Sequence, residues 1–273
     1  MTAHHNQYEF PTASPLTAVV KLGAGLITVT AEERASAGVT VTPIDDNEAG
    51  RSAAERTKVE LRGDELLVEA PDLAGGWPLR RGAKLRVEVR MPVGSSLRAR
   101  SGSSDVRCEG QLRDVSLQSG SGDLTLGEAT GEVSATTGSG GVNAGTVGGS
   151  LRVITGSGDV AARWVGEALS VNSASGDVSV GEVAGSVNIK SAAAEVRLGA
   201  VRADVKINTA SGDVVLGVPA GTPVWLDLHS LSGDARSELT PTGAPASGQP
   251  VRLQVRSLSG TIRVHTAVPT AAS

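Results

Sequence analysis

Acidic residues recur at one fixed position of the sequence, and a column of carboxylates could form a calcium site. They follow an 18-residue period from Asp105 to Asp213, with Gly141 and Glu195 at two of the positions in register. The aspartates of this register are Asp105, Asp123, Asp159, Asp177 and Asp213. Calcium takes about six to eight oxygen ligands, and calcium-binding β-rolls repeat a nine-residue motif, Gly-Gly-x-Gly-x-Asp-x-apolar-x. The register is therefore a candidate calcium ladder.

Two features of the motif favour a structural role for these acids. In Ser157-Gly158-Asp159 an apolar residue follows the acid directly, whereas in the calcium motif it comes one place later. Acids also fill only one corner of each repeat regularly, which supplies few oxygens for calcium. Ser and Asp side chains beside Gly commonly bind the backbone amides of a tight turn. We therefore predict turn-capping aspartates, with a calcium-binding β-roll as the alternative.

Residues that carry catalysis are not grouped in the sequence. The four histidines lie in the N-terminal segment or the closing region, with no matching nucleophile: His4, His5, His229 and His265. Enzymes built on β-helices line a groove with clustered acids and sugar-stacking aromatics, but this chain has only 3 Trp, 1 Tyr and 1 Phe. Gly120-Ser121-Gly122 belongs to the repeat and not to a strand-to-helix nucleophile elbow. We predict a chain that is not an enzyme, with no catalytic residue, cofactor or small-molecule substrate.

Cysteine content and charge argue against three further classes. The single cysteine, Cys108, excludes an internal disulfide framework and a Cys-based zinc cluster, and its alternating strand position predicts a small core residue. The chain has 25 Lys and Arg against 29 Asp and Glu, a net charge of −4. Nucleic-acid binding depends on clustered positive charge, so we expect no nucleic-acid partner.

The N-terminus gives an expectation for the compartment. Met1–Tyr8 has no basic stretch followed by an apolar run, so no secretory signal is expected. No window approaches the ~18 apolar residues of a membrane helix. We expect a cytoplasmic protein without a transmembrane segment, with peripheral membrane association as an alternative.

An 18-residue repeat with a half-period of nine predicts the fold. Apolar residues follow the acidic position and recur at the half-period, as at Val160 and Leu169, and polar residues alternate with them. This two-residue period is typical of strands with one buried face. Each repeat is thus one coil of two short strands, and about seven coils stack as an all-β parallel β-solenoid. Hydroxyl residues expected to form a structural turn ladder are Ser119, Thr137, Thr155, Ser173, Ser191 and Thr209.

Sequence composition predicts five segments. They are a flexible N-terminal segment (1–15), a β-rich cap (16–100), the regular solenoid (101–218), irregular closing coils (219–266) and a tail (267–273). In the cap, Gly63-Asp64 predicts a hairpin turn, and Asp45–Arg56 a loop or short helix. In the closing part, strands are expected at 224–229, 251–257 and 261–265.

One feature outside the repeat is typical of protein contacts. Trp77 lies close to Arg80 and Arg81 in a Gly- and Pro-containing loop. Trp and Arg are enriched at binding hot spots, so these residues are a candidate partner contact. The alternative is a Trp side chain folded over the core of the cap.

The chain resembles a known bacterial family. The residues that carry the resemblance are Val87–Leu97, where a strand ends in Pro92-Val93-Gly94, followed by Ser-Gly-Asp-Val at 18-residue spacing. This is similar to the "toastrack" family, also called the putative-adhesin β-strand-repeat family, and the similarity covers about residues 16–266. It implies a right-handed parallel β-helix-like fold, no established catalysis, no agreed functional residues, and relatives that accompany envelope-stress membrane proteins.

These observations favour a binding protein over other classes. The main hypothesis is a scaffold or protein-interaction module, with a link to envelope stress or assembly, that binds a protein partner or itself. An adhesin-like module that binds glycans or surfaces is the alternative, and the calcium-binding β-roll is a second one.

Overall fold

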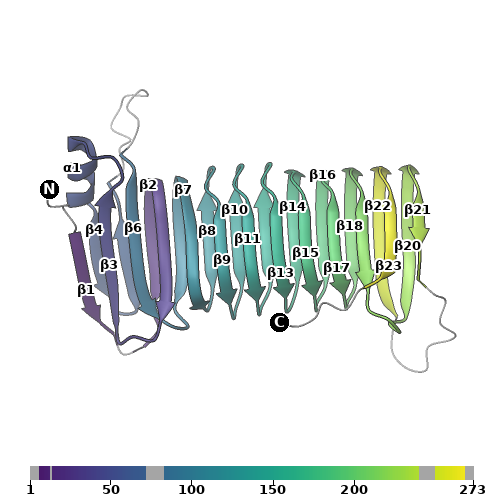
Figure 1. The fold of residues 1–273 in the computed structure, drawn as a ribbon, viewed down its shortest axis with the longest axis horizontal. Helices are drawn as coiled ribbons and strands as arrows, with labels where there is room; N and C mark the ends of the chain where they lie inside the picture. Colours follow the sequence, from purple (N-terminus) through teal and green to yellow (C-terminus); the bar gives the residue numbers. More distant parts are fainter. Residues whose placement is uncertain (1–5, 13, 72–82, 240–249, 268–273) are drawn as a thin grey trace. The chain divides into compact units, whose positions relative to one another are not determined.

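The protein is built almost wholly of parallel strands. The computed structural model describes residues 6–12, 14–71, 83–239 and 250–267, and the chain divides into two compact units, Met1–Ala144 (unit 1) and Gly145–Ser273 (unit 2). In each unit, strands stack in register with strands one 18-residue period away, as Leu97 does with Val115 and Leu169 with Val187 (Figure 1). The predicted all-β, parallel solenoid architecture is confirmed.

Unit 1 combines regular coils with a more complex N-terminal part. Its elements are β1 (Asn6–Pro11), β2 (Thr17–Glu32), β3 (Ser36–Pro43), α1 (Glu48–Glu55), β4 (Lys58–Arg62), β5 (Glu65–Glu69), β6 (Leu85–Pro92), β7 (Ser96–Leu112), β8 (Val115–Ser119), β9 (Leu124–Ala129) and β10 (Val133–Thr137). β2 and β7 are long and pair with each other along most of their length. The first half of β2 pairs with β5 and its second half with β6, so one strand serves both faces of the coil.

Antiparallel strands and a helix build the N-terminal part of unit 1. β3 pairs with β6, and β4 pairs with β5 through the predicted turn at Gly63-Asp64. The segment expected as a loop or helix contains α1, whose first turn is capped by Asn47 Oδ1 accepting from the Gly50 N–H at 2.7 Å. Within the described residues, no helix is long and apolar enough to cross a membrane.

The structure differs from the sequence prediction at the N-terminus. Residues 6–11, expected within a flexible segment, form β1, which pairs antiparallel with β3. The side chain of Asn6 also donates a hydrogen bond to the Ala54 carbonyl of α1 at 2.9 Å. Sequence periodicity missed this strand because its antiparallel pairing lies outside the 18-residue repeat.

Unit 2 is the more regular of the two. β11 (Val142–Val147) spans the boundary between the units, and the strands of unit 2 are β12 (Leu151–Thr155), β13 (Val160–Val165), β14 (Leu169–Ser175), β15 (Val178–Val183), β16 (Val187–Ala193), β17 (Val196–Val201), β18 (Val205–Ser211), β19 (Val214–Val218), β20 (Val224–Ser232), β21 (Ala235–Ser237), β22 (Val251–Ser259) and β23 (Ile262–Thr266). Even-numbered strands from β12 to β22 form one face, and odd-numbered strands from β13 to β23 form the other.

The core of unit 2 is a set of aliphatic columns. Side chains at one register position stack on each other and are completely buried: Val153, Val171, Ile189, Ile207 and Val255. The neighbouring residues point outward, as the two-residue period predicts. A thin core of this kind needs few aromatic side chains.

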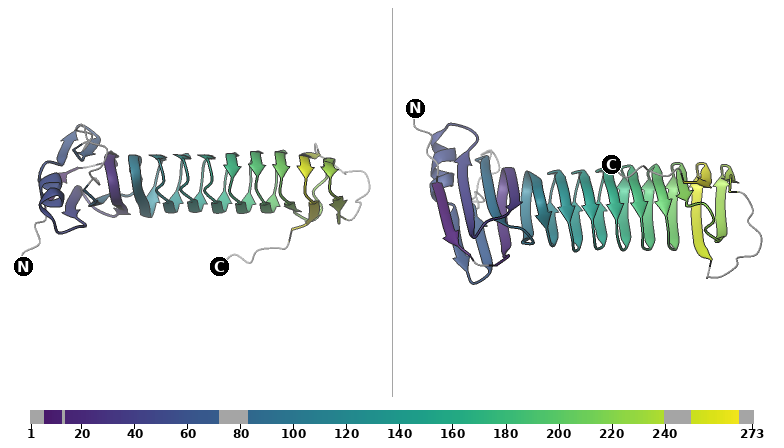
Figure 2. Two further views of the ribbon diagram at one scale, coloured as in Figure 1. Left: turned by 90° about the horizontal axis from the view of Figure 1, so that it is seen from above. Right: turned by 60° about the horizontal axis from the view of Figure 1, so that its bottom comes forward.

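The closing coils do not follow chain order. β22 pairs with β18 on one edge and with β20 on the other, and β23 pairs with both β19 and β21. The last segment of the chain therefore inserts between the regular coils and the coil formed by β20 and β21 (Figure 2). Burial follows this order, because Leu253 and Val255 of β22 are fully buried whereas Leu226 and Leu228 of β20 are only half-buried.

Candidate functional site

The aspartate ladder, formed by the five aspartates of the 18-residue register, binds backbone amides of the neighbouring coil. Oδ1 of each residue accepts the N–H of the residue that stacks on it. The acceptors, donors and distances are Asp105 to Asp123 (3.1 Å), Asp123 to Gly141 (2.7 Å), Asp159 to Asp177 (2.8 Å), Asp177 to Glu195 (2.9 Å) and Asp213 to Thr261 (2.7 Å). The aspartates thus join one coil to the next, where the sequence suggested caps within one turn.

The opposite corner uses the same device. Asp114 Oδ1 accepts the N–H of Glu132 at 3.0 Å, and Asp204 Oδ1 accepts the N–H of Arg252 at 2.9 Å. These carboxylates satisfy corner amides that have no partner in the strand ladder. The ladder aspartates are also exposed, so solvent screens the repulsion between stacked charges.

The geometry of the described residues does not gather ligands for a metal. In residues 6–12, 14–71, 83–239 and 250–267, no three His, Cys, Asp or Glu side chains come close enough to hold one ion. In the aspartate ladder, one oxygen of each side chain is already directed at an amide of the next coil. The aspartates therefore act as structural acceptors.

The hydroxyl ladder, the column of Ser and Thr at the same corner, has two geometries. In the first, the hydroxyl oxygen accepts the N–H three residues later, at 2.8–2.9 Å; these residues are Ser101, Ser119, Thr137 and Thr155. In the second, the hydroxyl donates to the carbonyl two residues later, at 2.8–3.0 Å; these are Ser173, Thr209 and Ser257. Ser191 Oγ is buried without a partner among the described residues.

The residue after the hydroxyl differs between the two geometries. In the first kind it is Gly, and a Cβ on Gly120 would lie 2.5 Å from the carbonyl oxygen of Gly102. In the second kind it is Ala or Leu, as at Ala174 and Leu258, and the strand continues two residues past the hydroxyl. The change from Gly to Ala or Leu therefore marks the coils of unit 2 in which the strand extends past the hydroxyl, a signal that sequence reasoning missed.

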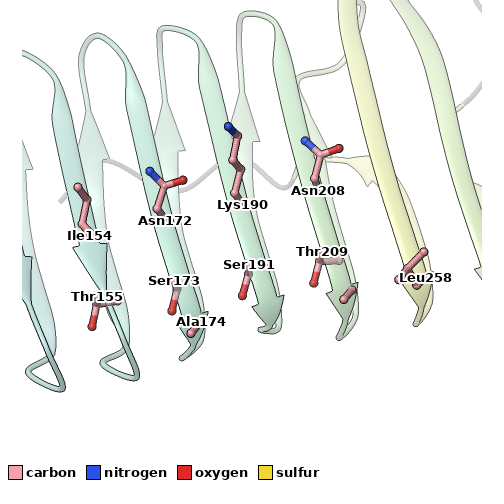
Figure 3. A pocket seen from close by; sticks show the side chains of 11 residues that line it. Ile154, Thr155, Asn172, Ser173, Ala174, Lys190, Ser191, Asn208, Thr209 and Leu258 are labelled. Atoms are coloured by element: carbon pink, nitrogen blue, oxygen red, sulfur yellow. The ribbon is translucent and has the colours of Figure 1, made fainter.

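A shallow hollow, which we call the corner groove, lies at this corner of unit 2. It is lined by Ile154, Thr155, Asn172, Ser173, Ala174, Lys190, Ser191, Asn208, Thr209, Ala210 and Leu258. Ile154, Asn172, Lys190 and Asn208 project from four neighbouring strands on one side, and Leu258 lies at the far end (Figure 3). Ile154 is 37% exposed and Leu258 58% exposed, so apolar surface lies at both ends of a polar centre.

The candidate partner contact and two of the four histidines cannot be placed in the described part of the chain. Trp77, Arg80, Arg81, His4 and His5 lie outside the described residues. His229 lies on β20 and His265 on β23, and His265 Nδ1 is 2.9 Å from the carbonyl oxygen of Thr266. The structure therefore does not bring His229 and His265 into the corner groove.

Cys108 is a core residue of unit 1. Its side chain is 2% exposed, and burial raises the pKa of its thiol to about 12. At pH 8 only about one molecule in ten thousand carries the thiolate.

We expect a thiol reagent such as Ellman's reagent to leave Cys108 unmodified at pH 8 in the folded chain and to modify it fully in denaturant. Rapid modification of the folded chain would contradict this burial.

Comparison with known proteins gives a family and distant structural neighbours. The model of the family described as Toastrack DUF4097 matches residues 24–266. Among solved structures, a "putative adhesin" from Bacteroides fragilis is 15% identical and covers 96% of this chain and 98% of that one, with a TM-score of 0.43. A "putative lipid binding protein" from Parabacteroides distasonis is 14% identical, covers 95% and 96%, and has a TM-score of 0.48. None of the curated proteins matches.

Proposed function

We propose that this chain, which belongs to the Toastrack DUF4097 family, is a non-enzymatic scaffold that binds an extended segment of a protein partner in the corner groove. The observation that carries the proposal is the groove itself, with exposed Ile154 and Leu258 at its ends and a row of amide and amine groups between them. An extended peptide can place an apolar residue on each end and form hydrogen bonds with the polar groups between them. The predicted link to envelope stress or assembly stays a prediction.

The spacing of the strands sets the length of the segment. From β12 to β22 the groove crosses four strand intervals. At ~4.8 Å each this is ~19 Å, the length of about six residues of extended chain. We expect a segment with an apolar residue near each end and an acidic residue between them, opposite Lys190.

Recognition depends on side chains in this groove. The strands between its two ends, β14, β16 and β18, are each paired on both edges within unit 2, so they have no free edge to which a peptide could add as a further strand. Asn172 and Asn208 can donate to and accept from the peptide backbone. The groove lining contains no aromatic side chain on which a sugar could stack, which favours a peptide over a glycan.

A displayed library of random peptides, selected on the full chain, tests the proposal. We expect enrichment of sequences with two aliphatic residues about six positions apart and an acid between them. Leu258→Glu and Lys190→Glu should each weaken binding of the selected peptides at least about tenfold. The matched control is Ser179→Glu, an exposed outward position on β15. Equal binding to all variants, or no enriched sequence, would contradict the proposal.

A further inference from the structure

The last coil of unit 2 leaves one edge of β20 without a strand partner among the described residues. The N–H of Val251 donates to the Pro223 carbonyl at 3.0 Å, which fixes the direction of the backbone groups. N–H and C=O of one strand residue point to the same side, and successive residues alternate. The odd-numbered residues of β20 therefore face β22, and the even-numbered residues, such as Leu226, Leu228 and Ser230, direct their N–H and C=O groups to the open edge.

The strand that forms this edge carries exposed apolar side chains. Trp225 is 53% exposed and Leu231 is 73% exposed, and both lie on the outward face of β20. On the inward face Leu226 and Leu228 are only half-buried, whereas Leu253 and Val255, which stack on them from β22, are fully buried. A strand edge with exposed apolar residues is a template for pairing with another strand.

We propose that β20 pairs antiparallel with β20 of a second copy of the chain, with Leu228 on the twofold axis. This register overlaps the whole of β20, because Leu228 is its central residue. It also makes hydrogen-bonded pairs of the even-numbered residues, whose backbone groups face the open edge. A twofold contact uses the same surface on both copies, so the surface must be complementary to itself.

The outward residues of β20 meet this requirement. In the proposed register Trp225 lies opposite Leu231 of the second copy, and Asp227 lies opposite His229 of the second copy. Each pair occurs twice by symmetry, with apolar pairs at the ends and Asp–His pairs at the centre. Directly opposite side chains of an antiparallel pair contact each other, so these are stabilising neighbours.

Neighbouring registers lack this match. Shifting the second copy by two residues in one direction places Asp227 opposite its own symmetry mate, and shifting it in the other direction places His229 opposite its own mate. Two carboxylates directly opposite each other are destabilising, and a His229–His229 pair removes both contacts between Asp227 and His229. Asp227 Oδ2 also accepts a hydrogen bond from Gln254 Nε2 at 3.0 Å, and Arg256 lies 3.8 Å from the same oxygen. These contacts tie one carboxylate oxygen of Asp227 to β22, and the second oxygen, Oδ1, is the acceptor that remains for His229 of the second copy.

The second strand of this coil adds to the same surface. β21 pairs with β23 on one edge and its residues are exposed. A twofold axis normal to the sheet that brings β20 onto β20 also brings β21 toward β21 of the second copy. The contact therefore continues on both faces of the coil. It covers the open strand edges that the end of a solenoid would otherwise expose.

The mass of the full chain in solution tests the inference. We expect sedimentation equilibrium to give twice the mass of one chain. On dilution the measured mass should fall to that of a single chain. His229→Asp places two carboxylates opposite each other and should weaken association at least about tenfold. The double variant Asp227→His/His229→Asp exchanges the two partners and should restore it, which loss of folding could not do. Ser179→Asp, on an exposed position of β15, is the matched control and should not change association.

Disulfide trapping tests the register. Trp225→Cys/Leu231→Cys should give a covalent dimer on air oxidation, because the two cysteines lie opposite each other only when Leu228 is on the axis. Trp225→Cys alone should form no covalent dimer under the same conditions. A native chain that has single-copy mass at every concentration, or a double variant that does not cross-link, overturns the inference. The inference rests on the proposed scaffold function and names a second copy as one of its partners. The peptide selection tests the corner groove alone, so failure of the dimer and failure of the groove can be told apart.

Discussion

Val171→Asp is expected to abolish the cooperative folding of unit 2. Val171 is completely buried in the middle of the aliphatic column, between Val153 and Ile189 in the flanking strands. An unpaired carboxyl in this position costs several kcal/mol even after it takes up a proton, because nothing in the column can hydrogen-bond to it. Domains are stable by only about 5–15 kcal/mol, so the loss is a large fraction of the total.

Amide hydrogen exchange of the full chain can show this effect. In the native chain the strands of unit 2 should exchange slowly, and in the variant they should exchange as an unfolded chain does. Asn172→Asp is the matched control, since it adds the same group one residue away on the outward face. In the Asn172→Asp variant the amides of unit 2 should exchange as slowly as in the native chain. Equal protection in both variants would contradict the two-residue period on which the architecture depends.

The regular coils could be predicted because their stability depends on one repeated local rule. An apolar residue such as Leu169 follows each corner, alternation then places Val171 inside, and one 18-residue period later the same types recur at Val187 and Ile189. Each coil also buries its apolar face only by stacking on its neighbours. The sequence of a repeat protein therefore contains both the strands and their pairing.

The closing coils could not be predicted in the same way. Both β20 and β22 have alternating apolar residues followed by Ser and Leu, as in Ser230-Leu231 and Ser257-Leu258, so either could stack on β18. The structure places β22 there, and β20 takes the end position with Trp225 exposed. The choice depends on the free energy of two alternative stackings, which sequence periodicity does not report.

The candidate site was hidden for a related reason. Sequence reasoning looked for chemistry in acids, histidines and Trp77, whereas the corner groove is lined by common side chains such as Asn172 and Lys190. The local signal was the replacement of Gly by Ala after the ladder hydroxyl. Whether a side chain fits after the hydroxyl depends on how closely the neighbouring coil approaches, as at Gly120, and the sequence of one coil does not contain that distance.

A bulge in β7 shows how one extra residue changes the pairing offset between neighbouring coils. Cys108 pairs with Leu126 at the 18-residue offset, but beyond the bulge Gln111 pairs with Glu128 at an offset of 17. With an unbroken 18-residue offset, polar Gln111 would stack on buried Ala129 and point into the core. Because of the bulge, Leu112 stacks on Ala129 instead and is completely buried. Gly110 makes this possible with a φ of +76°, a conformation that side-chain-bearing residues seldom adopt.

Gly110→Ala is therefore expected to cost about 3 kcal/mol or more of unfolding free energy, as backbone strain at the positive φ and a steric clash add together. A Cβ at Gly110 would lie 2.0 Å from the carbonyl oxygen of Ala31, which is fixed in β2. Gly127→Ala is the control, because a Cβ there would meet only the Cys108 carbonyl oxygen at 3.7 Å, and it should shift stability by less than about 0.5 kcal/mol. Urea midpoints of the two variants compare these effects directly. If both variants unfold at the native midpoint, the bulge does not depend on glycine at position 110, and this prediction is wrong.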